Sequence, residues 1–274
     1  MRILKKKTLW YILYGIVITA VFLYLLFPAD IVKSRLEAEA GSQNISLQAS
    51  LLQPSIPLGI QLKSMSVSSV DHKDVYFQGE ILDLQINLLS LLQKYSSISV
   101  SGKAYGGNFQ GGFGFASFSK VYPPVDAKLS FQNIELGKYS LIKQETGKTV
   151  TGKIKGNLFF SNAAETYAKT NGGITLLLTK GSYPLAESFL GLTRIEIDRC
   201  EIQAQLKKGI LKLEKMEMYG PQINGSLKGE IILAGDLQNS LLNLTGTIEI
   251  LSKNKVKTNI TITGTLANPI SRFI

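Results

Sequence analysis

The chain has 274 residues, 45% of them hydrophobic, and its 30 lysines and arginines against 20 aspartates and glutamates give a formal charge of +10. This length is enough for one sizeable domain or two small ones. The only cysteine, Cys200, excludes an intramolecular disulfide, and one cysteine with one histidine excludes a typical zinc site. Cys200 lies in a strand-like run, which favours a buried packing role.

The first predicted element is an apolar helix over residues 9–27, in which no residue is charged. About 20 apolar residues of helix cross the hydrocarbon core of a bilayer. Aromatic residues lie toward both ends, as at membrane interfaces: Trp10, Tyr11, Tyr14 and Tyr24. The charged residues before the helix are all basic: Arg2, Lys5, Lys6 and Lys7. The positive-inside rule therefore predicts a cytoplasmic N-terminus over 1–8 and a transmembrane helix over 9–27.

A cleavable signal peptide is the competing interpretation of this segment. Signal peptides have a shorter apolar region, of roughly 7–15 residues, followed by a small-x-small cleavage site. Residues 25–30 read Leu-Leu-Phe-Pro-Ala-Asp and offer no such site. We therefore predict a single-pass inner-membrane protein whose remaining residues lie in the periplasm.

Residues 28–44 are predicted to form a juxtamembrane helix and linker. Up to about Ala40 the segment consists of good helix formers, with apolar residues at helical spacing. Pro28 suits a first helical turn, and Gly41 would end the helix. The periplasmic domain is then residues 45–274, because no convincing domain boundary follows.

Within 45–274 the apolar residues recur with period two. The clearest examples are 81–88, 194–206 and 256–262. Clean alternation predicts antiparallel strands with one face covered and one in water, hence a mainly β fold. The alternation slips near Arg199–Cys200 and again between Leu213 and Met216, as a β-bulge would require. Short helices are expected only over 87–95 and 184–192.

Glycines punctuate this pattern in a loose apolar-x-Gly-x-apolar repeat, at 154–158, 223–227, 244–248 and 262–266. Strands kinked at glycine let a sheet curl, so the repeat is compatible with a curved sheet, a half-open barrel or a sandwich. Aromatic residues at alternating positions, Phe109, Phe113 and Phe115, give one predicted strand an apolar face. With Ile195 and Ile197 they are candidates for a packed core or for a groove that holds acyl chains.

No catalytic, cofactor-binding or metal-binding residues are predicted. Gly147-Lys148-Thr149 imitates the end of a phosphate loop, but the glycine that opens the motif, due at 142, is Ile142. Ser140-x-x-Lys143 has serine–lysine hydrolase spacing without the companion motifs, and no persuasive buried helix is expected to begin there. The only histidine, His72, lies in a polar turn sequence.

Several short motifs, taken in order, carry a resemblance to known families. They are Phe-Pro-Ala-Asp-Ile-Val-Lys-Ser-Arg-Leu-Glu at 27–37, Pro-Leu-Gly-Ile-Gln-Leu at 57–62, Tyr-Gly-Gly-Asn-Phe-Gln-Gly at 105–111 and Gly-Thr-Leu-Ala-Asn-Pro at 264–269. The chain resembles the type II secretion system protein N (GspN) family in its deltaproteobacterial form. The second pair of motifs also resembles the AsmA-like superfamily, whose members have an inner-membrane anchor and a curved periplasmic β-sheet linked to lipid movement.

The leading hypothesis that this resemblance implies is an auxiliary, non-enzymatic component of a type II protein secretion system, acting through contacts with other secretion components. The rival is an AsmA-like protein that shields acyl chains of lipid or lipopolysaccharide in an apolar groove. A membrane-tethered hydrolase is the least favoured, and nucleic acid is not expected as a partner. An apolar face sealed by packing would remove the groove, whereas an open apolar trough would favour the rival.

Overall fold

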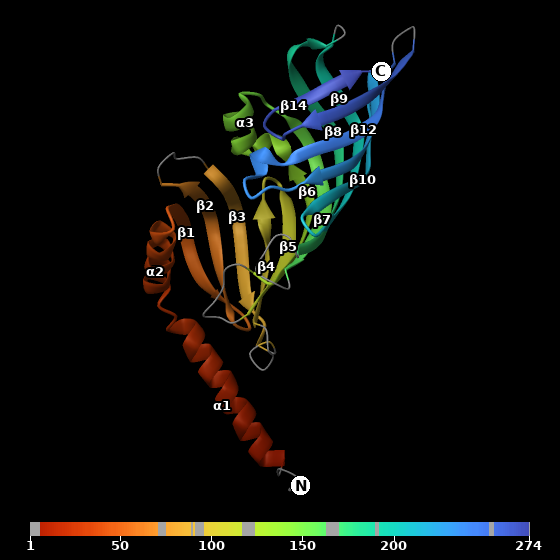
Figure 1. The fold of residues 1–274 in the computed structure, drawn as a ribbon. Helices are drawn as coiled ribbons and strands as arrows, with labels where there is room; N and C mark the ends of the chain where they lie inside the picture. The colour runs from red at the N-terminus through yellow and green to blue at the C-terminus, as the bar shows by residue number, and fades with distance from the viewer. Residues whose placement is uncertain are drawn as a thin grey trace.

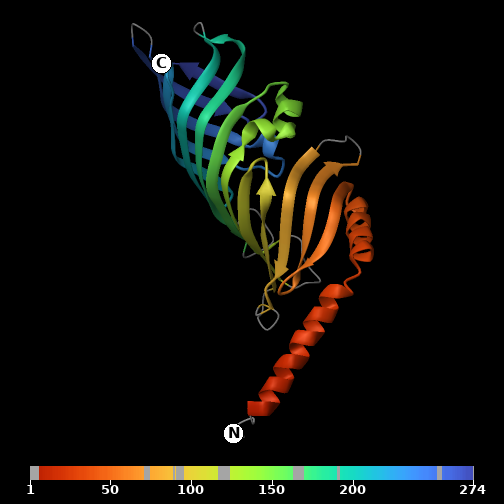
Figure 2. The same cartoon turned by 180° about the vertical axis from the view of Figure 1, so that it is seen from behind.

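The computed structural model describes residues 6–70, 75–88, 90, 96–116, 124–162, 170–189, 192–251 and 255–273. In this part of the chain, two N-terminal helices precede one antiparallel sheet of fourteen strands (Figures 1 and 2). The helices are α1 (Lys6–Leu25), α2 (Ala29–Ser42) and α3 (Ser140–Thr146), with 3-10 turns η2 (Leu136–Lys138) and η4 (Leu237–Asn239). The strands are β1 (Ile45–Ser55), β2 (Gly59–Ser69), β3 (Val75–Ile86), β4 (Ser96–Ala104), β5 (Gly107–Phe115), β6 (Asp126–Glu135), β7 (Thr151–Asn162), β8 (Thr170–Phe189), β9 (Leu192–Lys207), β10 (Ile210–Tyr219), β11 (Ile223–Ile232), β12 (Leu241–Ile250), β13 (Val256–Gly264) and β14 (Pro269–Phe273).

The sheet is a simple meander. Every strand pairs with the next one along the chain, and the order ends at β1 on one edge and β14 on the other. Among the described residues the main contacts join neighbouring strands, with α2 on β1, η2 on β7 and α3 on β3 as the chief additions. The predicted mainly β, antiparallel fold is therefore confirmed. Of the shapes that the sequence left open, the described strands form a single curved sheet rather than a sandwich (Figure 1).

The cross-strand register aligns the apolar residues of all fourteen strands. Starting from Leu52 on β1, directly opposed partners can be followed strand by strand to Phe273 on β14. This central row is Leu52, Leu62, Leu82, Gly102, Phe109, Phe131, Gly156, Leu176, Ile202, Met216, Leu227, Gly246, Ile260 and Phe273. Because side chains alternate between faces, the residues beside this row are polar, as in Asp83, Ser101 and Gln110.

Local irregularities keep the apolar residues on one face where the alternation slips. The predicted slip near Arg199–Cys200 lies beside Asp198, which stands opposite Lys180, a residue with φ of 52° that the β8–β9 ladder skips. The second slip is a register shift between Leu213 and Lys215 in the β9–β10 ladder. The second predicted slip is therefore confirmed, whereas at the first the ladder skips one pair and resumes in the same register, without the register shift of a β-bulge.

The helix predicted over 184–192 is wrong. Residues up to Phe189 continue β8, and β9 begins at Leu192, so this segment is the end of a long hairpin. Pro184 lies opposite Arg194 and Phe189 opposite Leu192, with a register shift between them. Pairing with β9 supplies backbone partners that an isolated helix of this length would lack, and tertiary context overrides the local pattern. Of 87–95, Leu88 and Ser90 belong to a 3-10 turn and most of the rest lies outside the described residues.

Helix α2 packs against the β1 side of the sheet. Leu52 and Leu62 are 2% and 3% exposed, and α2 contributes Val32 and Leu36 to the cluster around them. Helix α2 corresponds to the helix predicted from Pro28, and it continues through Gly41 to Ser42. Among the described residues, no single helix meets the length and hydropathy of a membrane span. Trp10–Leu25 and Ala29–Ser42 meet them jointly, as a pair bent by 64°.

Glycines in the central row permit close approach of neighbouring strands. A Cβ on Gly102 would overlap the carbonyl oxygen of Ile81 and lie 2.8 Å from the ring of Phe109. A Cβ on Gly246 would likewise overlap the carbonyl oxygen of Ser226. These positions accept only glycine without a backbone shift, which agrees with the curl expected from the glycine repeat.

Candidate functional site

The most extensive chemical feature of the sheet is its apolar face, defined here as the central row and the next two rows along the strands in one direction, all on the same side of the sheet. The row adjacent to the central row includes Ile60, Leu84 and Val100, and continues through Leu129, Leu158, Ile174, Ala204, Leu213, Leu244 and Ile262. The row beyond it includes Ile86, Ile98, Phe113, Phe160 and Leu206. With strands about 4.8 Å apart, the central row follows the sheet for roughly 60 Å.

The predicted groove residues all belong to this side of the sheet or its β8–β9 extension, but they do not form one cluster. Phe109, Phe113 and Phe115 alternate along β5, where Phe115 is 8% exposed. Ile195 and Ile197 lie on β9, four strands away, and are half-buried. Among the described residues, no buried cluster joins the two groups.

The predicted basic flank falls largely outside the described residues. Arg2 and Lys5 are not described, and Lys6 and Lys7 begin the backbone of α1. His72 also lies outside the described residues.

Different parts of the apolar face are covered to different degrees. Over β1–β3 it is closed by α2, as the low exposure of Leu52 shows. Over β9–β13 a second cluster, centred on Ala204, Leu213, Leu242 and Leu244, is formed by side chains of the sheet alone. Apolar side chains between these two clusters, such as Leu158 and Leu176, keep part of their surface accessible. A small apolar hollow of 100 Å³ opens beside Met216, Met218, Gly225, Leu227, Ile248 and Ile260.

An aromatic cluster borders the apolar face at the β4–β5 turn. Tyr105 and Gly106 have φ of 52° and 76° and form the two-residue turn. The Tyr105 ring makes edge contacts with Phe77 and Tyr139, and its hydroxyl accepts a hydrogen bond from the Gln78 backbone N–H at 2.7 Å. Burial raises the pKa of the Tyr105 phenol. The Tyr-Gly-Gly motif thus has a structural role in ending the hairpin.

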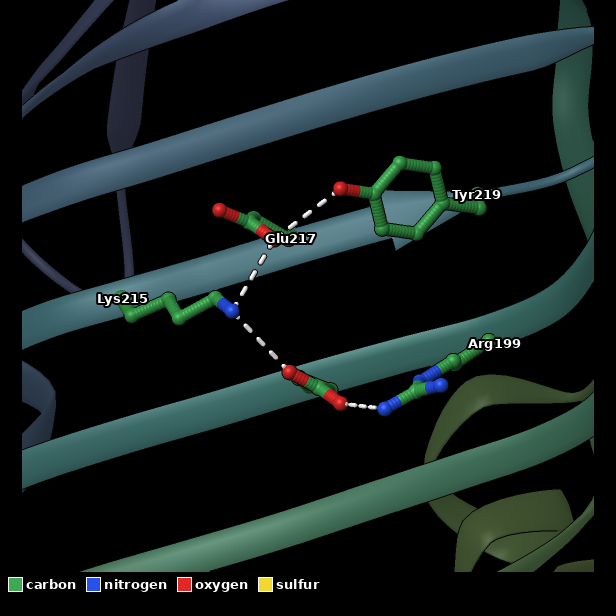
Figure 3. A network of polar contacts seen from close by, with 5 residues as sticks. Arg199, Lys215, Glu217 and Tyr219 are labelled. Carbon is green, nitrogen blue, oxygen red and sulfur yellow. Dashed lines mark hydrogen bonds and ion pairs between the residues drawn. The ribbon is translucent and has the colours of Figure 1, made fainter.

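The opposite, polar face carries a network of charges on β9 and β10 (Figure 3). Glu201 and Glu217 lie directly opposite each other, an arrangement of like charges that destabilises a sheet. Lys215 lies between them, with its Nζ 3.0 Å from Glu201 Oε2 and 3.1 Å from Glu217 Oε2. Arg199 donates to Glu201, and the Tyr219 hydroxyl donates to Glu217 at 3.0 Å.

The network changes the acidity of its members. Hydrogen bonds from Arg199 and Lys215 lower the pKa of Glu201, and hydrogen bonds from Lys215 and Tyr219 lower that of Glu217. The two carboxylates in turn raise the pKa of Lys215. These shifts keep both carboxylates and the Lys215 ammonium charged at neutral pH, so Lys215 offsets the repulsion between the two glutamates.

A wide hollow of 1190 Å³ lies on the polar face over β3–β7. Its walls combine apolar surface with hydroxyls and amides from residues such as Ser99, Ser101, Gln110 and Asn157. Asp83, at its margin, accepts hydrogen bonds from the Ser55 hydroxyl at 2.9 and 3.0 Å. Two further charged residues, Asp126 and Lys128, also line the hollow.

Two nucleophile candidates have no catalytic surroundings. Ser140 begins the short helix α3, in which Lys143 is exposed, and the Ser140 Oγ is buried without a hydrogen-bond partner in the described part of the chain. Cys200 is 4% exposed, and burial raises the pKa of its thiol, which disfavours the reactive thiolate. No group of three or more His, Cys, Asp or Glu among the described residues is arranged to hold a metal ion.

Comparisons with protein-family models, curated proteins and solved structures each found no match. The physical features therefore carry the functional argument. Two of them were not anticipated from the sequence, namely the alignment of apolar residues across every strand and the Lys215 network. The alternation of each strand was a signal for the first, but the alignment depends on the order and register of pairing, which alternation does not specify.

Proposed function

We propose that this protein binds the acyl chains of lipids along the apolar face of its sheet, held at the inner membrane by the segment 9–27. The observation that carries the proposal is the uninterrupted central row of apolar residues and glycines, left without a covering layer beyond β1–β3 among the described residues. Between the two buried clusters, apolar side chains such as Leu158 and Leu176 keep part of their surface accessible, and a soluble protein rarely leaves a contiguous apolar surface accessible unless something binds there.

The chemistry of the face agrees with this ligand. Acyl chains need apolar contact and no directional hydrogen bonds, and the central row contains no polar side chain from Leu52 to Phe273. Methionines at 216 and 218 add flexible, polarisable surface beside the apolar hollow, which suits chains of varied length. The polar face would meanwhile remain in water.

Type II secretion is a second proposal, and it uses the opposite face. The sequence resemblance to the GspN family motivates it, and the charged network around Lys215 is the structural observation that favours a protein contact there. Charged surfaces steer encounters between proteins and set specificity. In this proposal the anchored domain acts as an auxiliary secretion component without catalysis.

One experiment tests both proposals. The full chain is purified from membranes in mild detergent, and mass spectrometry then detects retained lipid and co-purifying secretion proteins. Leu176→Asp places a charge in the central row, and Lys215→Glu reverses a charge on the polar face. Lipid binding predicts that retained lipid falls for the first variant alone, whereas a secretion contact predicts that partner recovery falls for the second alone. Recovery of neither lipid nor partner from the unmodified chain contradicts both proposals.

A further inference from the structure

Exposed apolar side chains gather at one end of strands β1–β4. Ile56 and Leu58, in the turn between β1 and β2, are 76% and 44% exposed, and Leu88, after β3, is 46% exposed. The Ile86 backbone N–H donates to the Leu58 carbonyl oxygen at 2.9 Å, which ties the two connections together. These three residues are called the basal tips below.

The chain path places the basal tips at the end of the sheet that faces α1. Helix α2 runs away from its junction with α1, and the chain then reverses so that β1 returns beside α2. The 14 residues of α2 rise about 21 Å, whereas the 11 residues of β1 span about 36 Å. The β1–β2 turn therefore reaches back at least to the level of the helix junction, and the base of these strands lies toward α1 in Figure 1.

The sequence around the basal tips is uncharged. No charged residue occurs from 53 to 61 or from 84 to 93, and 88–92 reads Leu-Leu-Ser-Leu-Leu. The connection at the other end of β2 and β3 is different, because Asp71, Lys73 and Asp74 follow Val70. One end of these hairpins thus has the composition of a membrane-facing surface and the other that of a water-facing loop.

We infer that the basal tips insert into the periplasmic leaflet of the bilayer that α1 enters. The partner is a lipid surface because the tips continue the apolar surface of the anchor, where Leu26 and Ile31 at the α1–α2 junction are 75% and 63% exposed. The inference rests on the proposed anchoring by 9–27. It adds a second membrane contact that orients the sheet on the bilayer.

This contact would open the apolar face onto the lipid. Leu88 lies two residues after Ile86 along the chain, and Ile86 pairs with Ile98 in the outer row of the apolar face. An acyl chain leaving the leaflet beside the tips would meet that row without crossing water. The basal tips would therefore be the entrance to the acyl-chain site.

Site-specific tryptophan fluorescence tests the inference on the full chain in phosphatidylcholine–phosphatidylglycerol vesicles. Trp10 is the only tryptophan, so Trp10→Phe provides a background without this fluorophore. Ile56→Trp reports on the tips, and Val70→Trp, at the other end of β2 and 51% exposed, is the matched control. Leu58→Trp provides a second reporter if Ile56→Trp alters the circular dichroism spectrum.

Lipids brominated along the acyl chain should quench Ile56→Trp about twofold or more, and most strongly when the bromine lies near the headgroup, as for an interfacial residue. Val70→Trp should instead be quenched by acrylamide from the water. Equal acrylamide quenching at both sites, without quenching by brominated lipid, overturns the inference.

The same samples separate this result from the proposed function. Lipid retained by the detergent-purified chain, together with a water-exposed Ile56→Trp, would leave acyl-chain binding standing and remove the insertion of the tips. Quenching of Ile56→Trp by brominated lipid, together with no retained lipid, would do the reverse.

Discussion

Truncation of Leu52 measures how strongly α2 closes the apolar face. Leu52 is 2% exposed and packs in the cluster that includes Val32 and Leu36 of α2. Replacement by alanine removes three carbons, worth about 0.8 kcal/mol each when buried, and leaves a cavity. We therefore expect Leu52→Ala to lower the free energy of unfolding by about 3 kcal/mol.

Two leucine-to-alanine variants at less buried positions serve as controls for Leu52→Ala. Leu158 lies on the same face over β7, where no helix covers it, so Leu158→Ala should cost only about 1 kcal/mol. Leu51 is 45% exposed, and Leu51→Ala should stay within about 0.5 kcal/mol of the unmodified chain.

Thermal unfolding of the full chain in detergent, followed by circular dichroism, measures the difference. A loss of 1 kcal/mol lowers the midpoint by about 2–4 °C in a domain of this size, so the expected shifts are about 6–12 °C for Leu52→Ala and about 2–4 °C for Leu158→Ala. Equal shifts for the two variants would refute the argument that the face is covered over β1–β3 and open over β7.

Three further outcomes are expected. Gly102→Ala should lower the unfolding midpoint by several degrees because the added Cβ overlaps the neighbouring strand. Gly112→Ala should leave the midpoint unchanged, because the nearest atom to the added Cβ is 3.8 Å away. Similar midpoints for the two variants would contradict the close-approach argument. The pKa of Glu201 is lowered in the folded chain, so its contribution to stability is present above the unfolded value of about 4.3 and is lost as pH falls through the folded pKa. Lys215→Met should therefore weaken the loss of stability between neutral pH and that acidic window, and an unchanged pH profile would count against the network. The raised pKa of Tyr105 predicts that its phenol ionises above the usual range for tyrosine, measured as the difference between the absorbance titrations of the unmodified chain and Tyr105→Phe; ionisation at or below that range would disagree with its burial.

The local sequence was sufficient to predict the class of fold, a mainly β protein. Period-two alternation in stretches such as 81–88 and 256–262 specifies which side chains share a face, because successive residues of a strand point in opposite directions. Helix α2 was foreseen in the same way from local helix formers.

Tertiary structure decided the properties on which the functional proposals depend. The central row exists only because fourteen strands pair in order with a register that aligns their apolar residues, and alternation within one strand carries no information about its neighbour's register. The same limit explains the error at 184–192, where pairing with β9 determined the backbone conformation.

The sequence by itself determined that this protein has a sheet with one apolar and one polar face, preceded by an uncharged segment at 9–27. Only the tertiary structure decided that α2 covers the apolar face over β1–β3 and that no second layer covers the rest of it among the described residues. It also decided that Lys215 lies between two opposed glutamates. The physical reason is that the direction of a side chain is set by neighbouring residues in the chain, whereas what covers it is set by contacts between distant segments.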